Sequence, residues 1–129
     1  DAALAVVDDE KILFASHAER FSKIKNDSHL NSGIIREALK HGKPDIVFWY
    51  ENPLLKATRR LLAGQKNIWL NPTSYCRAYG IDAPVKWGNH HESHMAAGYH
   101  TSKFKKSATL VIDAIGEWNT TTIWNQSIF

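Results

Sequence analysis

The hydrophobic pattern begins with two short apolar runs separated by polar turn residues. The runs at 2–7 and 12–15 flank the polar tetrapeptide 8–11, Asp-Asp-Glu-Lys. Strand, tight turn and strand is the simplest interpretation, so this segment is predicted to be a β-hairpin. The polar stretch 19–31 has neither helical nor strand periodicity, and it is predicted to be a loop.

Three later segments have the spacing of helices. The first begins at Asn31 or Ser32 and ends near His41, and a second begins at Asn52-Pro53 and ends at Gly64. The third spans 90–100. In the second helix the leucines are predicted to face the core and the basic side chains to face solvent. The residues concerned are Leu54, Leu55, Leu61 and Leu62 on the inside and Lys56, Arg59 and Arg60 on the outside.

Dense apolar runs at 46–50 and 108–112 are typical of strands that are buried on both faces, as in parallel sheets. A short strand at 84–87 and a threonine-rich return strand at 120–124 complete the pattern. No element is assigned with assurance between 67 and 82. Helices that alternate with strands after an opening hairpin predict an α/β fold.

Composition narrows the class of protein. The chain has 129 residues, of which 43% are hydrophobic and 22% charged, so disorder and coiled coil are excluded. The net charge of +3 is too small to indicate nucleic acid by itself. A single cysteine, Cys76, excludes an intrachain disulfide and suits the cytoplasm, where we expect the protein to act. No apolar run is long enough for a membrane span, and we expect no membrane partner.

The most informative segment is 89–94, Asn-His-His-Glu-Ser-His. His90 and His94 are four residues apart, which on a helix places both rings on one face, where they can bind one divalent metal. Asp113 follows an apolar strand and is the candidate third ligand. Two histidines with one carboxylate are a common ligand set for ferrous iron. The zinc-protease signature is excluded because position 95 is Met95 instead of histidine.

Other residues near these ligands are candidates for binding or catalysis. His91 lies on a neighbouring helix face and is a candidate for substrate contact. A glycine turn at Gly116 and Glu117, followed by the hydroxyls of Thr120 and Thr121, is a candidate phosphate site. Both features have ordinary alternatives, a solvated helix histidine and a plain hairpin turn, which the residues alone leave open.

Four ordered motifs resemble the NodU/CmcH-type O-carbamoyltransferase family. They are the opening Asp-Ala-Ala with its hairpin, Glu-Arg-Phe at 19–21 with Lys-Asn-Asp at 25–27, His-His-x-x-His-x-Ala-Ala at 90–97, and Val-Ile-Asp-Ala-Ile-Gly-Glu-Trp at 111–118. The departures are Ala18, Asn26 and Ala114, where the family usually has Glu, His and Gly. These changes affect loops and remove none of the candidate ligands.

The resemblance implies a fold, a reaction and a set of partners. The fold is an actin/Hsp70-like, ribonuclease H-like lobe with a mixed β-sheet flanked by helices. Residues 1–129 would be the truncated N-terminal lobe of a Kae1-like domain, without its second lobe and without the YrdC-like domain. In this family that domain makes carbamoyl-adenylate from carbamoyl phosphate and ATP, and the carbamoyl group then passes to a substrate hydroxyl.

The resemblance also implies roles for individual residues. His90, His94 and Asp113 match the family's metal ligands; the metal is expected to be Fe(II), with Zn or Mn as alternatives. The other roles come from the chemistry of the residues. A general base works best with a pKa near neutral, so the histidine at position 91, His91, is the candidate, and Gly116, Glu117, Thr120 and Thr121 are the candidate nucleotide contacts. Arg20 and Lys25 are candidate contacts to phosphate or acceptor, although a solvated basic loop is the stronger interpretation.

Two alternative functions stay open from the sequence. One is a related Kae1/TsaD-type tRNA threonylcarbamoyl transferase, which shares the fold and the metal helix. The other is a non-enzymatic, basic nucleic-acid-binding module. It would use the scattered side chains of Lys56, Arg59, Arg60, Lys103, Lys105 and Lys106. We expect the isolated segment to be inactive.

Overall fold

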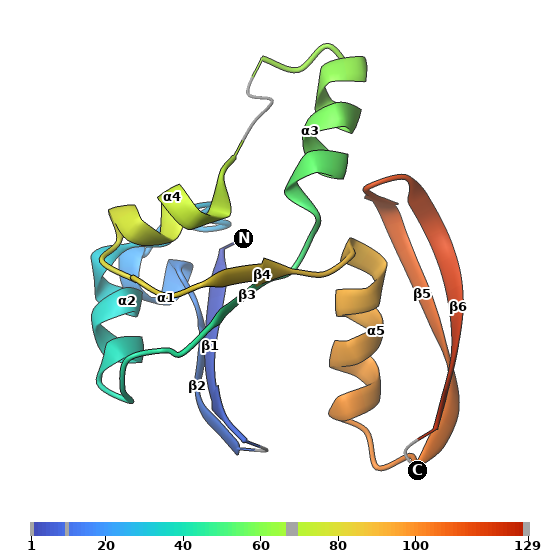
Figure 1. Cartoon of the computed structure of the whole chain (residues 1–129), viewed down its shortest axis with the longest axis horizontal. Coiled ribbons are helices and arrows are strands. Elements are labelled where there is room, and N and C mark those ends of the chain that lie inside the picture. Colours follow the sequence, from blue (N-terminus) through green and yellow to red (C-terminus); the bar gives the residue numbers. More distant parts are fainter. Residues whose placement is uncertain (1, 10, 67–69, 128–129) are drawn as a thin grey trace. The chain divides into compact units, whose positions relative to one another are not determined.

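The computed structural model describes residues 2–9, 11–66 and 70–127. The chain divides into two compact units. Unit 1 contains Asp1–Val47 and Thr73–Pro84, and unit 2 contains Phe48–Pro72 and Val85–Phe129. Figure 1 labels the helices and strands of both.

The predicted opening hairpin is confirmed in unit 1. Strand β1 (Ala3–Asp8) pairs antiparallel with β2 (Lys11–His17), and a register shift lies between Val6 and Val7. Asp9, in the turn, has a positive φ of 48°. Asp is one of the residue types that tolerate this left-handed conformation, so the polar turn suits the connection.

Three helices accompany the hairpin in unit 1. The short α1 (Glu19–Ser22) lies in the stretch that was predicted to be a loop, so that prediction is wrong for these four residues. Helix α2 (Ser32–Leu39) is confirmed, and α4 (Pro72–Ala78) occupies the segment to which no element was assigned. The core of the unit is made of small and branched apolar side chains. Its buried members are Ala18, Ile34, Ile35, Ala38, Cys76 and Ile81.

Asn31 holds the beginning of α2, and its replacement is a direct test of this capping. Its Oδ1 accepts hydrogen bonds from the backbone N–H groups of Gly33 and Ile34, both at 3.1 Å, and its Nδ2 donates to Ala18 O at 3.0 Å. Asn31→Ala is expected to lower the free energy of unfolding by about 1–2 kcal/mol, measured by chemical denaturation. Asn125→Ala, at an exposed position in unit 2, is the control. Equal stability of the two variants would contradict the capping role.

Unit 2 begins with β3 (Val47–Trp49, whose first residue still belongs to unit 1) and α3 (Pro53–Leu62). Asn52 caps α3, as predicted, by accepting from the N–H groups of Leu54 and Leu55. The predicted facing of α3 is wrong. Three of its leucines are largely exposed and Pro53 and Ala57 are buried instead. The exposed leucines are Leu54 at 62%, Leu61 at 59% and Leu62 at 73%.

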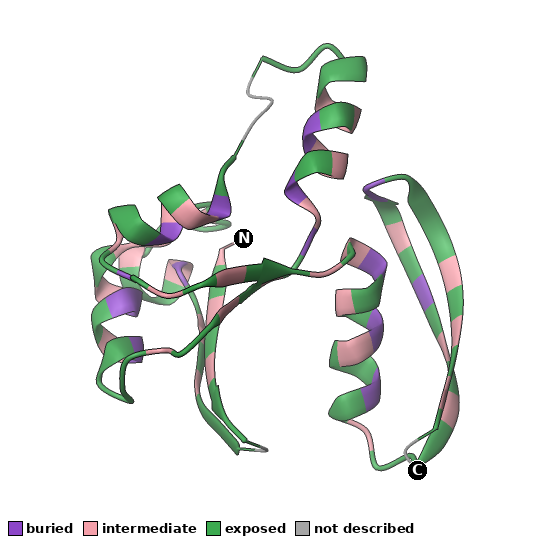
Figure 2. Ribbon diagram, in the orientation of Figure 1, coloured by how far each residue is buried: buried purple, intermediate pink, exposed green. Residues whose placement is uncertain are grey.

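The rest of unit 2 consists of one short strand and a helix that packs on a hairpin. The predicted strand at 84–87 is β4 (Val85–Trp87), which pairs with β3, and α5 (His90–His100) has the predicted bounds. Strands β5 (Lys106–Gly116) and β6 (Asn119–Ser127) pair antiparallel. The buried side of α5 faces this hairpin (Figure 2). The core residues are Met95, Tyr99 and Val111, with Trp124 partly buried against them.

The α/β class is confirmed, but the expected single mixed sheet is not what these residues form. In the described residues the strands form three two-stranded sheets, β1–β2, β3–β4 and β5–β6. The apolar runs at 46–50 and 108–112 are also not buried on both faces, since Phe48 is 65% exposed and Ile112 is 73% exposed. Along most of β5 exposed residues alternate with partly or fully buried ones, and α5 packs against this strand. No helix in the described part of the chain is long and apolar enough to cross a membrane.

Candidate metal centre

Three side chains of unit 2 converge on one point, and they are the three that the sequence selected. His90 Nε2 lies 2.8 Å from Asp113 Oδ2 and 3.1 Å from His94 Nε2, and His94 Nε2 lies 3.9 Å from the same carboxylate oxygen. One donor atom from each residue falls within 4.8 Å of the others. We call His90, His94 and Asp113 the histidine–aspartate cluster.

The beginning of α5 positions both histidines. Asn89 has an extended backbone conformation, and its N–H donates to Glu92 Oε2 at 3.5 Å, which ties the turn before the helix to its first turn. His90 and His94 then lie one helical turn apart, with ring centroids separated by 4.7 Å. The predicted geometry of the pair is therefore present. His100, the last residue of α5, is exposed.

A bulge in the hairpin places Asp113 beside these rings. The pairing of β5 and β6 is regular as far as Ile112–Thr121 and resumes at Gly116–Asn119, with a register shift between them. Side chains in a regular strand alternate, so Asp113 and Ile115 would share a face. The bulge turns Gly116 to the inner face instead, where it is buried, while Ile115 is exposed. Asp113 therefore lies inside β5, and not at its end as predicted.

Gly116 allows a close packing contact between β5 and α5 that the sequence did not predict. A Cβ atom at this position would lie 2.3 Å from His90 Cδ2 and 2.7 Å from His91 Cδ2. Real Cβ contacts are never this short, so only glycine allows the strand to approach both rings. The first residue of the predicted nucleotide loop thus packs closely against α5.

The cluster favours an ionised aspartate. The backbone N–H of Ala114, 2.7 Å from Asp113 Oδ1, is the main cause that lowers the pKa of Asp113; burial opposes this effect, and His90 and His94 add to it. The His90 side chain is 17% exposed, that of Asp113 31% and that of His94 54%. The cluster is thus sheltered at His90 and open to solvent at His94.

The donor set fits a divalent transition metal. Two imidazole nitrogens and one carboxylate oxygen suit iron or zinc, and they leave coordination positions open. Three ligand atoms that approach one another around a single point, on a rigid helix and a bulged strand, are the arrangement that such an ion requires. The residues therefore fit the metal that the family resemblance implies.

Behind His90 lies a buried carboxylate that the sequence reasoning missed. Glu51 is 4% exposed, its Oε1 pairs with Lys56 Nζ, and its Oε2 lies 3.8 Å from His90 Nδ1. Burial is the main cause that raises the pKa of Tyr50, and the Glu51 carboxylate adds to it. Glu51 follows the apolar run 46–50 just as Asp113 follows 108–112, so the same signal that selected Asp113 was available for Glu51.

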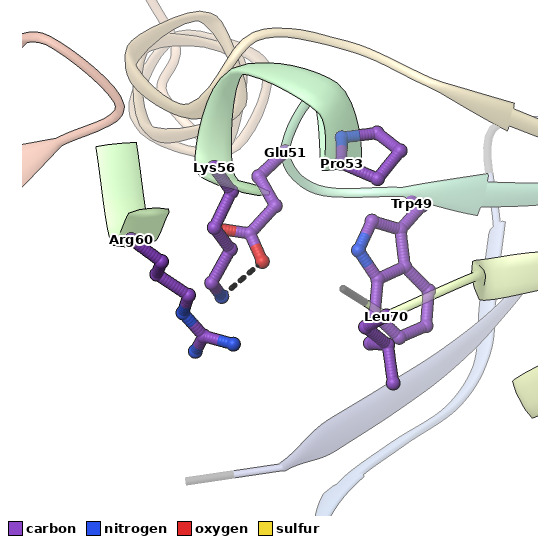
Figure 3. Close-up of a pocket in the computed structure, with 6 residues that line it drawn as sticks. All are labelled: Trp49, Glu51, Pro53, Lys56, Arg60 and Leu70. Carbon is purple, nitrogen blue, oxygen red and sulfur yellow. Dashed lines mark hydrogen bonds and ion pairs between the residues drawn. The ribbon is translucent and has the colours of Figure 1, made fainter. Parts of the chain in front are cut away.

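Figure 3 shows the surroundings of this carboxylate. A small pocket is lined by Trp49, Glu51, Pro53, Lys56, Arg60 and Leu70. Lys56 and Arg60 lie one turn apart on α3, and the Lys56 ammonium points at Glu51. Lys56 is therefore directed inward, whereas Lys103, Lys105 and Lys106, which the nucleic-acid alternative also uses, are exposed.

His91, the predicted general base, is buried against the hairpin. It is 3% exposed, and its Nδ1 lies 2.8 Å from Thr122 Oγ1, which also accepts from Trp124 Nε1 at 2.8 Å. Its Nε2 is buried and has no hydrogen-bond partner within the described ranges. This position favours a structural role for His91, joining α5 to β6, over direct contact with a substrate.

Thr122 is the shared partner of this small network, and the loss of its hydroxyl is expected to be costly. Thr122→Val leaves a buried imidazole nitrogen and a buried indole N–H without a partner. We expect the free energy of unfolding to fall by about 1–3 kcal/mol, measured by denaturant titration. Thr120→Val, at an exposed position of the same strand, is the matched control. If Thr122→Val were as stable as Thr120→Val, the network would be refuted.

The other predicted contacts are placed as follows. Glu117 is 8% exposed and has a positive φ of 54°. Its Oε1 accepts a hydrogen bond from the backbone N–H of Asn52 at 2.6 Å, which connects the hairpin turn to the beginning of α3. Thr120 and Thr121 are exposed on β6. Arg20 and Lys25 belong to unit 1, where Lys25 pairs with Glu19 at 3.3 Å. Nucleotide or acceptor binding by these residues stays a prediction.

Comparison with known proteins agrees with the motifs. The chain is 27% identical, over 157 aligned residues, to the uncharacterized protein sll1178 of Synechocystis sp.. That alignment covers 97% of this chain and 25% of the relative, so the chain spans about a quarter of the relative's length. A family model described as the carbamoyltransferase N-terminus matches residues 49–128, which include all three residues of the histidine–aspartate cluster. The chain therefore belongs to the carbamoyltransferase N-terminal family.

Proposed function

We propose that this chain is part of an O-carbamoyltransferase that transfers a carbamoyl group from carbamoyl-adenylate to a substrate hydroxyl. Carbamoyl phosphate and ATP are the co-substrates, and a YrdC-like domain of the intact protein forms the adenylate. The reaction takes place in the cytoplasm, on a small-molecule or nucleotide-type acceptor. The N-terminal lobe of an actin/Hsp70-like, Kae1-like domain is the fold that accompanies this function.

The observation that carries the proposal is the histidine–aspartate cluster within the family match. Its members are 23 residues apart in the chain, at His90 and Asp113, yet their side-chain atoms lie 2.8 Å apart. A histidine pair on an ordinary solvated helix would have no reason to meet a carboxylate from a bulged strand.

His90, His94 and Asp113 would hold the metal, which we propose to be Fe(II), with Zn or Mn as the alternatives. When bound, a divalent cation polarises an acyl or phosphoryl oxygen and offsets the charge that develops during acyl transfer. The protein itself contributes the rigid placement of the two rings, through the capped helix and the close approach of Gly116. The exposed side of His94 leaves this cluster accessible from solvent.

The two alternatives from the sequence are now less well supported. The family match concerns carbamoyltransferases, which favours carbamoyl transfer over threonylcarbamoylation of tRNA. The basic residues proposed for a nucleic-acid module include Lys56, which pairs with the buried Glu51.

Mass spectrometry of candidate acceptors tests the proposal. The intact natural protein is incubated with ATP, carbamoyl phosphate and a panel of hydroxylated metabolites, with tRNA as a separate arm. The proposal predicts that one acceptor gains the mass of one carbamoyl group, only when both co-substrates are present. Modification of tRNA alone, or no modification of any acceptor by metal-loaded protein, would contradict it.

A further inference from the structure

The ring of His90 has one nitrogen that the candidate metal centre does not use. Its Nε2 points into the histidine–aspartate cluster, whereas its Nδ1 is buried and has no hydrogen-bond partner among the residues described. Buried polar atoms are nearly always paired, so an unpartnered ring nitrogen requires an explanation. A neutral imidazole that binds a metal through Nε2 carries its proton on Nδ1, and a buried N–H then needs an acceptor.

Glu51 is the acceptor in reach. Its Oε2 lies 3.8 Å from His90 Nδ1, which is slightly longer than a hydrogen bond, and its side chain is 6% exposed. Histidines that bind metals commonly donate their second N–H to a carboxylate, which fixes the orientation of the ring. A buried carboxylate this close to the second nitrogen of a candidate ligand matches that arrangement.

The surroundings hold Glu51 in this place from three directions. Lys56 Nζ pairs with its other oxygen, Oε1. Ser93 Oγ, on α5, donates to the carbonyl oxygen of Tyr50 at 2.7 Å, which fixes the preceding residue against the metal helix. On the following side, the N–H of Asn52 donates to Glu117 at 2.6 Å. A carboxylate that served only to neutralise Lys56 would not require these ties to α5 and to the hairpin turn.

The His90 ring is also confined on its remaining sides. The Tyr50 ring meets it edge-on, with centroids 5.9 Å apart. Gly116 approaches it so closely that no Cβ fits between them. The ring therefore has little freedom to turn, and Glu51 Oε2 lies 3.8 Å from its Nδ1.

We propose that Glu51 is a positioning residue that orients His90 for metal binding by accepting a hydrogen bond from its Nδ1, and that Lys56 holds the Glu51 carboxylate in place. This inference rests on the proposed metal site at His90, His94 and Asp113. Glu51 touches neither substrate nor metal, and it acts only through His90.

Cobalt(II) binding by the intact protein tests the inference. The double variant Glu51→Leu/Lys56→Met replaces the buried pair by apolar side chains of similar size, a change that proteins often tolerate without loss of stability. Cobalt affinity is expected to fall by about 10- to 100-fold, and the visible spectrum of the bound ion to change. Glu51→Gln keeps an acceptor oxygen for His90 and is expected to lose clearly less affinity. Glu37→Gln, at an exposed ion pair with Lys40 in unit 1, is the matched control.

The outcomes separate this inference from the proposed function. If wild-type protein binds cobalt and the double variant binds it with the same affinity and spectrum, Glu51 has no positioning role, while the metal site stands. If wild-type protein binds no metal, the metal site fails and the inference fails with it.

A second measurement needs no variant. In zinc-loaded protein with labelled histidines, NMR should detect a slowly exchanging proton on His90 Nδ1, and an unprotonated Nδ1 would overturn the inference.

Discussion

Gly116→Ala is expected to abolish metal binding at the histidine–aspartate cluster and to destabilise unit 2. The added methyl group would lie 2.3 Å from one ring carbon of His90 and 2.7 Å from one of His91. Either β5 or the beginning of α5 must then move, and the bulge that places Asp113 beside His90 lies at the same point. Overpacking of this kind typically costs about 1–3 kcal/mol. Metal content after dialysis and thermal unfolding measure the two effects.

Gly98→Ala is the matched control for this prediction. Gly98 lies in α5 itself, and an added Cβ would have its nearest neighbour, Thr109 Cγ2, at 3.9 Å. Because alanine favours a helix more than glycine does, this variant is expected to be more stable by about 0.5–1 kcal/mol and to bind metal normally. If Gly116→Ala bound metal as well as Gly98→Ala does, the close approach of strand and helix would not matter for the site.

His90→Ala is expected to reduce the metal content of the purified protein from one ion per chain to nearly none. His90 is the central member of the cluster, because its Nε2 contacts both Asp113 and His94. Its removal leaves one exposed imidazole and one carboxylate, and two ligands are too few for a tightly held ion. Carbamoyl transfer is expected to be lost together with the metal. Elemental analysis and the acceptor assay measure the two quantities.

His100→Ala is the control, since His100 lies on the same helix, is exposed and is not a member of the cluster. It is expected to keep both metal and activity. Retention of the metal by His90→Ala would show that the ion is bound elsewhere in the intact protein.

Local signals in the sequence were sufficient for most of the helices and strands. Asn31 and Asn52 precede their helices as caps, and both accept the expected backbone hydrogen bonds. The spacing of His90 and His94 predicted the geometry of the pair, because helical periodicity depends only on neighbours in the chain. These features need no knowledge of what packs against them.

The facing of α3 could not be predicted from the leucine spacing, because an ion pair of the helix also determines it. Leucine spacing indicated that Leu54 and Leu61 were buried, yet both are exposed. The buried carboxylate of Glu51 draws Lys56 inward, so the helix turns its basic side toward the protein. An ion pair inside a protein has no periodicity that a hydrophobic pattern reveals.

The bulge in β5 could not be predicted from the hydrophobic pattern either. The sequence predicted that the strand ends before Asp113, whereas β5 continues to Gly116 with a register shift between Ile112 and Gly116. A bulge adds a residue without changing the apolar or polar character of its neighbours. Gly116, which the sequence suggested as part of a phosphate site, packs closely against His90, and phosphate binding there stays a prediction.

The most direct test of this account is the anomalous X-ray diffraction of crystals of the intact, metal-loaded protein. Data on both sides of the iron absorption edge, and of the zinc edge for zinc-loaded crystals, locate the ion independently of its expected ligands. We predict one anomalous peak per chain, bonded to the Nε2 atoms of His90 and His94 and to a carboxylate oxygen of Asp113. A metal bound at other residues, or a peak absent from this cluster in protein that transfers carbamoyl groups, would contradict the account.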